Sequence, residues 1–161
     1  MKNIYVLLLL IIVLVSCNTN RKQTDTSQEA IRQTSYDSLL AVELGADKYG
    51  MKQYIMAFLM RGDSSSADSA EAAMLQRAHL DNITQMAENG DLILAGPFLD
   101  DGDIRGIYIF NVSTVEKARE LTSSDPAIKA GVLKMELHPW YGSAILQKLN
   151  ELHASIQAEG I

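Results

Sequence analysis

Two segments of this 161-residue chain are apolar on both faces of an extended backbone, and they limit the folds that the chain can adopt. Side chains alternate between the two faces of a strand. In residues 52–60 the two faces carry Tyr54, Met56, Phe58 and Met60 against Ile55, Ala57 and Leu59. Residues 107–110 repeat this pattern. Such strands must be covered on both sides, so the sequence predicts two strands at the centre of a sheet with material on each face.

Helices and shorter strands are predicted between and after these segments. Apolar residues three and four apart indicate a helix from Asp68, with Glu71 as a capping residue, to Asn89-Gly90. Residues 92–95 read as a short apolar strand. A second helix is predicted at Ser113-Thr-Val-Glu116, which matches a capping box. Residues 133–139 alternate between apolar and polar side chains, which predicts an edge strand with one dry face.

The order of these elements is strand, helix, strand, strand, helix, strand, which is typical of the ferredoxin-like βαββαβ sandwich of the α+β class. Helices cover only one face of such a sheet. The simplest cover for the other face is a second copy, so we expect a homodimer in which two sheets enclose an α+β barrel and a small-molecule pocket. After the last strand, Ile145, Leu149, Leu152 and Ile156 predict an amphipathic C-terminal helix.

The amino-terminal segment predicts export and anchoring. Lys2 precedes an apolar run over residues 4–15, which is shorter than the roughly 20 residues of a membrane span. The run ends in Leu14-Val15-Ser16-Cys17, and a small residue before cysteine resembles the lipobox of bacterial lipoproteins. We therefore expect cleavage before Cys17, lipid on its sulfur, and a membrane lipoprotein of the bacterial cell envelope that faces the periplasm. The alternatives are an uncleaved anchor or a plain signal peptide.

The sequence divides into four predicted regions. Residues 1–16 are the predicted signal peptide, and residues 17–48 a flexible tether rich in Asn, Thr, Gln and Ser that includes a short amphipathic helix near residues 36–44. Residues 49–147 form the predicted globular domain, and residues 148–161 the end of the C-terminal helix. Cys17 is the only cysteine, so no disulfide can form within one chain.

Charge and motif content exclude several classes of partner. The chain has 14 basic and 20 acidic residues, and loss of Lys2 leaves 13 against 20, a net charge of −7. This balance argues against nucleic acid and against extended contact with anionic lipid. Three scattered histidines without HExxH spacing do not predict a metal site, and Gly96-Pro97 is no phosphate loop. We expect neither a metal nor a cofactor.

His79 is the most informative single residue, because it lies on the apolar face of the first predicted helix with Leu75 and Ile83. An imidazole among such side chains needs a polar partner. The other two histidines, His138 and His153, fall on a polar strand face and a surface helix, where solvated side chains are expected.

Four short motifs occur in one order along the chain. They are Arg77-Ala-His79-Leu80, Ala95-Gly96-Pro97, Asp125-Pro126 followed by Ala130-Gly131, and Glu136-Leu-His-Pro139-Trp140. Together they resemble the YCII-related (YciI-like) domain family over about residues 51–140. The resemblance implies a dimeric ferredoxin-like barrel and a His/Asp pair, which falls here on His79 and Asp125. Proteins similar to this family include an enzyme that dehydrochlorinates a hydroxyquinol and relatives of muconolactone isomerase.

The implied pair has a workable chemistry. In the split βαβ order the segment after Asp125 leads into the fourth strand, beside the first, so we expect His79 and Asp125 within hydrogen-bond reach at the mouth of a pocket. A carboxylate fixes the imidazole tautomer and creates a general base for elimination or isomerisation of a small cyclic or aromatic compound. Alternatively, His79 is a satisfied core histidine and Asp125 only the N-cap before Pro126, in a non-catalytic module that binds a small molecule or protein. Gly106-Ile107 lacks the polar residue that often follows this glycine in small soluble relatives, which argues against a hydroxyl relay.

Overall fold

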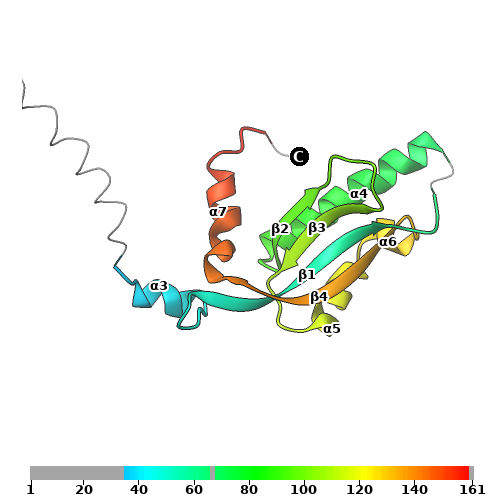
Figure 1. Cartoon of the computed structure of the whole chain (residues 1–161). Helices are drawn as coiled ribbons and strands as arrows, with labels where there is room; N and C mark the ends of the chain where they lie inside the picture. Colours follow the sequence, from blue (N-terminus) through cyan, green and yellow to red (C-terminus); the bar gives the residue numbers. More distant parts are fainter. Residues whose placement is uncertain (1–34, 66–67, 160–161) are drawn as a thin grey trace, which may run out of the picture. The chain divides into compact units, whose positions relative to one another are not determined.

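The computed structural model describes residues 35–65 and 68–159 (Figure 1). Residues 1–38 form a separate unit, so the fold below is that of the second unit, Leu39–Ile161. The predicted signal peptide, Cys17 and most of the tether lie outside the described residues. Within the described ranges, none of the helices has the length and apolar character needed to span a membrane.

Four strands form one antiparallel sheet. They are β1 (Met51–Arg61), β2 (Leu92–Pro97), β3 (Ile104–Phe110) and β4 (Leu133–Ser143), and their order in the sheet is β2-β3-β1-β4. The two strands that are apolar on both faces, β1 and β3, are therefore central and paired with each other, as predicted. The sheet and the order of its elements confirm the α+β, ferredoxin-like fold.

The first helix, α4 (Ser69–Glu88), has the ends that its sequence predicts. The Asp68 side chain caps it by accepting a hydrogen bond of 2.8 Å from the amide of Glu71. The helix ends at Asn89, and Gly90 then turns the chain with φ of 75°. A residue with a side chain rarely adopts this conformation, which explains the glycine.

The second helix, α5 (Val115–Thr122), begins one residue later than predicted. Thr114 caps it by accepting from the amide of Lys117, whereas the backbone carbonyl of Ser113 accepts a hydrogen bond from Gln53 of β1. Ser113 therefore belongs to the loop. A short helix, α6 (Pro126–Lys129), follows Asp125.

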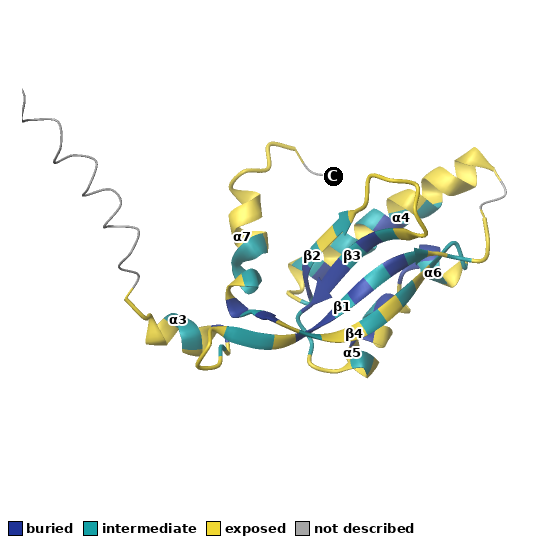
Figure 2. Ribbon diagram, in the orientation of Figure 1, coloured by how far each residue is buried: buried dark blue, intermediate teal, exposed yellow. Residues whose placement is uncertain are grey.

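The core lies on both faces of the sheet (Figure 2). The face that packs on α4 and α5 buries Ile55, Ala57, Met86, Leu92, Tyr108, Phe110 and Ala118. The opposite face buries Tyr54, Ile93 and Ile109 under Trp140, Leu146 and Leu149. On the same face, Met56, which packs against this cluster, and Phe58, Met60 and Ile107 are only partly buried. These four side chains, on the two central strands, form an apolar surface that we call the open face.

The C-terminal region differs from its prediction. β4 continues past Pro139 to Ser143, which is possible because β4 is an edge strand. The single amphipathic helix is replaced by a 3-10 turn, η2 (Ala144–Lys148), and a short helix, α7 (Leu149–Ala154). Ile145, Leu152 and Ile156 are 50%, 61% and 80% exposed, so only part of the predicted apolar stripe is buried.

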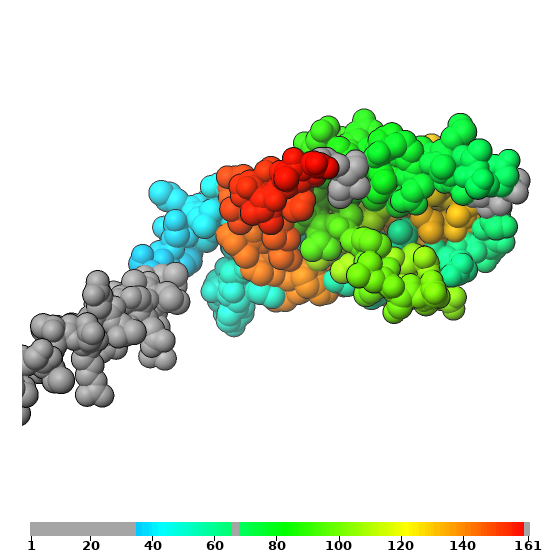
Figure 3. All heavy atoms as spheres, turned by 90° about the horizontal axis from the view of Figure 1, so that it is seen from above, coloured from blue at the N-terminus to red at the C-terminus, as the bar shows by residue number. Residues whose placement is uncertain are grey.

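Contacts from η2 and α7 link the C-terminal segment to earlier parts of the domain. Gln147 donates to the backbone carbonyl of Leu44, a buried residue just after the short helix α3 (Ser38–Glu43). Asn150 donates a hydrogen bond of 2.8 Å to the carbonyl of Leu92 at the outer edge of β2. In the space-filling view of Figure 3 the red end of the C-terminal segment lies next to the green part of the chain, and both α4 and this segment line a groove at β2.

Candidate functional site

His79 points from α4 into the domain. It is 6% exposed, and with Met86 it is one of the two buried residues of this helix. Among the described residues, the buried polar side chains are His79, Thr122 and Asp125. A buried imidazole is costly unless its nitrogens have partners. The polar partner that the sequence requires for His79 must therefore come from this small set or from a neighbouring hydroxyl.

Asp125 is that partner. Its Oδ2 lies 2.6 Å from Nδ1 of His79, and the aspartate is fully buried. Its Oδ1 accepts hydrogen bonds from the amides of Ala127 at 2.8 Å and Ile128 at 3.4 Å, which caps α6. One carboxylate thus caps a helix and orients an imidazole at the same time. The contact joins residues that are 46 positions apart, because α6 packs against α4.

Both side chains of the pair lie in the interior, with His79 6% exposed and Asp125 0% exposed. A buried carboxylate accepts hydrogen bonds, so the proton of neutral His79 is on Nδ1 and a lone pair remains on Nε2. The arrangement fixes one tautomer and leaves one basic nitrogen.

Tyr108 faces that nitrogen. Its Oη lies 3.3 Å from Nε2 of His79, and the two ring planes differ by 22°. The phenol is 2% exposed and packs edge-on against Phe110. Burial, and then the negative charge of Asp125, raise the pKa of the Tyr108 hydroxyl. The hydroxyl therefore keeps its proton at neutral pH.

The sequence reasoning missed Tyr108. A polar side chain was considered only at position 107. Ile107 lies on the face of β3 opposite to that of Tyr108 and pairs with Phe58. Tyr108 pairs with Ala57 and shares the helix-covered face with it. Strand alternation predicts this face, but an isolated tyrosine in an apolar strand is also an ordinary core residue. Nothing in the spacing identified its partner.

A further hydrogen bond ties α4 to the turn before Asp125. The side-chain amide of Asn82 donates to the hydroxyl of Ser124 at 3.0 Å, and that hydroxyl donates to the carbonyl of Leu121. Among the described residues, Oδ1 of Asn82 is the buried side-chain atom without a hydrogen-bond partner. The contact holds the segment that carries Asp125 against the helix that carries His79.

The other candidate residues are not brought to this pair. His138 is exposed and makes a 2.9 Å contact with Glu136, while His153 is exposed on α7. In the turn between β2 and β3, the Asp100 side chain accepts a hydrogen bond from the amide of Gly102. In residues 35–65 and 68–159, no group of three His, Cys, Asp or Glu side chains is placed to hold a metal ion.

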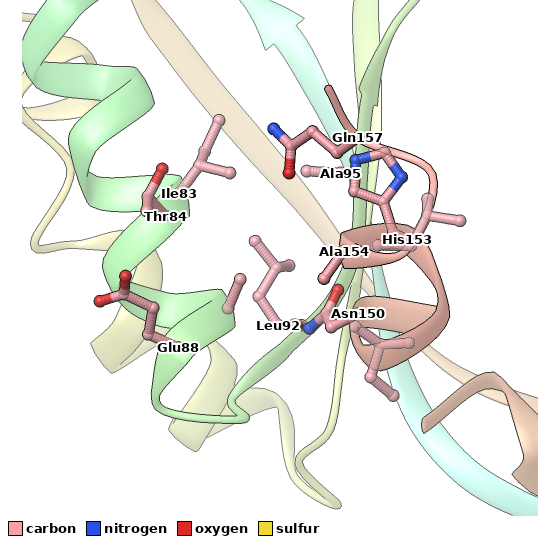
Figure 4. A pocket seen from close by; sticks show the side chains of 12 residues that line it. Ile83, Thr84, Glu88, Leu92, Ala95, Asn150, His153, Ala154 and Gln157 are labelled. Carbon is pink, nitrogen blue, oxygen red and sulfur yellow. Dashed lines mark hydrogen bonds between the residues drawn. The ribbon is translucent and has the colours of Figure 1, made fainter. Parts of the chain in front are cut away.

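A groove of about 530 Å³ lies elsewhere, between α4, β2 and α7 (Figure 4). Its lining does not include His79 or Asp125. The α4 side contributes Ile83, Thr84, Ala87 and Glu88, β2 contributes Leu92, Ile93, Leu94 and Ala95, and the C-terminal segment contributes Asn150, His153, Ala154 and Gln157. The walls are thus mostly apolar, with polar side chains spread along both helices.

Comparison with known proteins agrees with the fold. The model of the YCII-related domain matches residues 55–141, from within β1 to within β4, which is more than half of the chain. No curated protein sequence matches this chain. The matched region contains His79, Tyr108 and Asp125. The chain therefore belongs to the family of YCII-related domain proteins.

Proposed function

We propose that the His79–Asp125 pair carries out general acid–base chemistry, an elimination or isomerisation, on a small cyclic or aromatic compound without a cofactor. The hydrogen bond of 2.6 Å between Nδ1 and Oδ2 in a buried setting carries this proposal. It fixes the tautomer and supports an imidazolium ion by the adjacent carboxylate.

In an elimination, His79 takes a proton from a carbon next to the one that bears the leaving group. The electron pair of the broken C–H bond forms the new double bond, and the leaving group departs with its own bonding electrons. Asp125 stabilises the imidazolium that results. If the proton is instead returned to a different carbon, the same residues perform an isomerisation. A positioned base of this type contributes roughly 100- to 10,000-fold to the rate.

The first test uses two probe compounds suggested by the resemblance, a chlorinated hydroxyquinol and muconolactone. Chloride release reports elimination, and the change in absorbance reports isomerisation. We expect turnover of at least one probe, with a loss of about 100-fold or more in His79→Gln. The matched control is His138→Gln, which removes an exposed imidazole that also contacts a carboxylate. Equal rates in the wild type and His79→Gln would refute the assignment of the base.

A second candidate function, binding of a small molecule without catalysis, is favoured by the groove in Figure 4. Its size and mostly apolar walls suit a ligand of modest size. Mass spectrometry of compounds released from the purified protein tests it directly. Filling the groove with Ala154→Trp should remove the compound, whereas His79→Gln should retain it. The absence of any retained compound in the wild type would count against this function.

We also propose that the protein is a lipid-anchored homodimer of the bacterial cell envelope. The sequence at Cys17 supports the anchor, and the open face supports the dimer. In the proposed dimer, two sheets pack face to face and enclose an α+β barrel. Labelling with palmitate tests the anchor, because Cys17→Ser removes the acylated sulfur and should abolish the label. Undiminished label in this variant would contradict it.

A further inference from the structure

The hydrogen-bonded chain continues beyond the pair to Tyr108. We infer that Tyr108 is a positioning residue that holds His79 in both of its protonation states. Its hydroxyl donates to Nε2 of neutral His79 and accepts from Nε2–H of the imidazolium. This inference rests on the proposed function, because it concerns how the base at the same site is kept ready.

The two contacts of His79 assign its ring atoms different roles. Asp125 contacts Nδ1 at 2.6 Å and can only accept while it is ionised, so it holds the Nδ1–H proton. The Tyr108 hydroxyl lies 3.3 Å from Nε2 and can either donate or accept. Reversal of that bond needs only rotation of the O–H group. The hydrogen bond between Tyr108 and His79 can therefore exist with neutral and with charged histidine without a change in the position of either ring.

The orientation of the rings fits this hydrogen bond. The lone pair of Nε2 lies in the plane of the imidazole, and the O–H of a phenol lies near the plane of its own ring. An angle of 22° between the rings of His79 and Tyr108 lets these directions meet. The ring centroids are 6.4 Å apart, within the range of offset stacking, and Oη lies 3.3 Å from Nε2, within hydrogen-bond distance.

Packing alone does not account for the hydroxyl. Phe110 lies two residues further along β3, on the same face, and fills its place with an aromatic ring that has no polar atom. Burying a hydroxyl without a partner is costly, whereas a buried hydroxyl that is bonded to imidazole is satisfied. Tyr108 is 2% exposed and its ring is held against Phe110, so its Oη is fixed near Nε2.

The experiment is ¹⁵N NMR of the histidine rings in the wild type and in Tyr108→Phe. In the neutral wild type we expect His79 to carry its proton on Nδ1, with the Nε2 resonance displaced towards that of a hydrogen-bonded acceptor. In Tyr108→Phe the proton should stay on Nδ1, while Nε2 moves to the position of a free acceptor. After protonation, Nε2–H should exchange with solvent more slowly in the wild type than in the variant.

The control is Tyr54→Phe, which removes the hydroxyl of another buried tyrosine that bonds to the carbonyl of Ser143. It should leave both His79 resonances unchanged. If Tyr108→Phe does not fold, the ¹³Cζ resonance of Tyr108 in the wild type replaces it, and should shift when His79 is protonated while that of Tyr54 does not.

The outcomes separate the two proposals. An Nε2 resonance that is identical in the wild type and Tyr108→Phe overturns the role of Tyr108 and leaves the His79–Asp125 pair intact. A Tyr108 ¹³Cζ resonance that does not shift when His79 is protonated also overturns the role of Tyr108. A wild-type His79 with its proton on Nε2 instead contradicts the orientation by Asp125, on which the proposed function depends.

Discussion

Asp125 uses its two carboxylate oxygens for different purposes, and this division decides what each substitution does. Oδ1 caps α6, and Oδ2 holds Nδ1 of His79. An asparagine keeps an oxygen for the cap and can offer its amide N–H to Nδ1. The imidazole would then move its proton to Nε2, where the Tyr108 oxygen can accept it.

We therefore predict that Asp125→Asn and Asp125→Ala differ sharply in stability. Asp125→Ala removes the cap, at about 1 kcal/mol, and leaves a buried imidazole N–H without a partner, at about 1–3 kcal/mol. Asp125→Asn should cost about 1 kcal/mol or less, yet lose turnover as strongly as His79→Gln, because the basic nitrogen then faces the wrong way. Urea unfolding and probe turnover measure the two effects. Equal destabilisation by both variants would contradict the division of roles.

The raised pKa of the Tyr108 hydroxyl predicts that the stability of the protein depends on pH. Burial and the charge of Asp125 raise the pKa of this hydroxyl, whereas in the unfolded chain the pKa is about 10. Above about pH 10 the unfolded state loses a proton that the folded state keeps, so the free energy of unfolding falls as pH rises. This stability is fully present below about pH 10.

Tyr108→Phe should remove that part of the alkaline loss. Between about pH 9 and pH 11, the wild type should lose on the order of 1 kcal/mol more than the variant. Tyr49→Phe, at a ring that is 72% exposed, should keep the slope of the wild type. Urea unfolding at each pH measures this. Parallel profiles for Tyr108→Phe and the wild type would mean that Tyr108 ionises with the same pKa in both states.

At the scale of the elements, the sequence predicted correctly the features that depend on residues close together in the chain. Asp68 and Gly90 bound α4 because capping and left-handed turns depend on a few neighbouring residues. The apolar side chains on both faces of β1 and β3 placed these strands at the sheet centre. The pair of His79 and Asp125 was also predictable, since a family resemblance and the strand order both brought them together.

Local signals failed where tertiary contacts decide. Spacing of Leu149, Leu152 and Ile156 indicated one amphipathic helix, but periodicity does not say what a helix packs against or when an edge strand ends. Residues Ala144–Lys148 form the 3-10 turn η2, so the α-helix begins only at Leu149. Tyr108 was missed for a related reason, because its partner lies on α4, 29 positions away.

The attachment of α7 yields a prediction at this scale. Asn150 donates to the carbonyl of Leu92, one of the contacts that hold α7 on the edge of β2. Asn150→Ala should leave this carbonyl without its partner, at about 1 kcal/mol, and speed hydrogen exchange in α7 while β1 and β3 stay protected. Gln157→Ala, at an exposed side chain just beyond the helix, is the control. Unchanged exchange in α7 would show that other contacts hold it.

At the scale of the whole molecule, the open face is the apolar surface that a second copy would cover. It is flanked by polar side chains of β4, including Glu136 and His138, and part of the same sheet face is already covered by Trp140 and Leu149. Apolar side chains that are only partly buried on two central strands fit an interface with a partner. The dimer that we propose buries these side chains without changing the fold of either copy.

Phe58 gives the sharpest test, because it lies in the middle of the open face between Ile107 and Glu136. In a monomer, a lysine there would be partly solvated and would have the Glu136 carboxylate nearby, so the fold should survive Phe58→Lys. In a dimer the same charge would be buried between two sheets, which costs several kcal/mol. We expect sedimentation velocity of the chain without its first 17 residues, at micromolar concentration, to give a dimer for the wild type and a folded monomer for Phe58→Lys. Gln76→Lys, on the exposed side of α4, should remain dimeric. A monomeric wild type would remove the second copy as the cover, and a dimeric Phe58→Lys would place the interface on another surface.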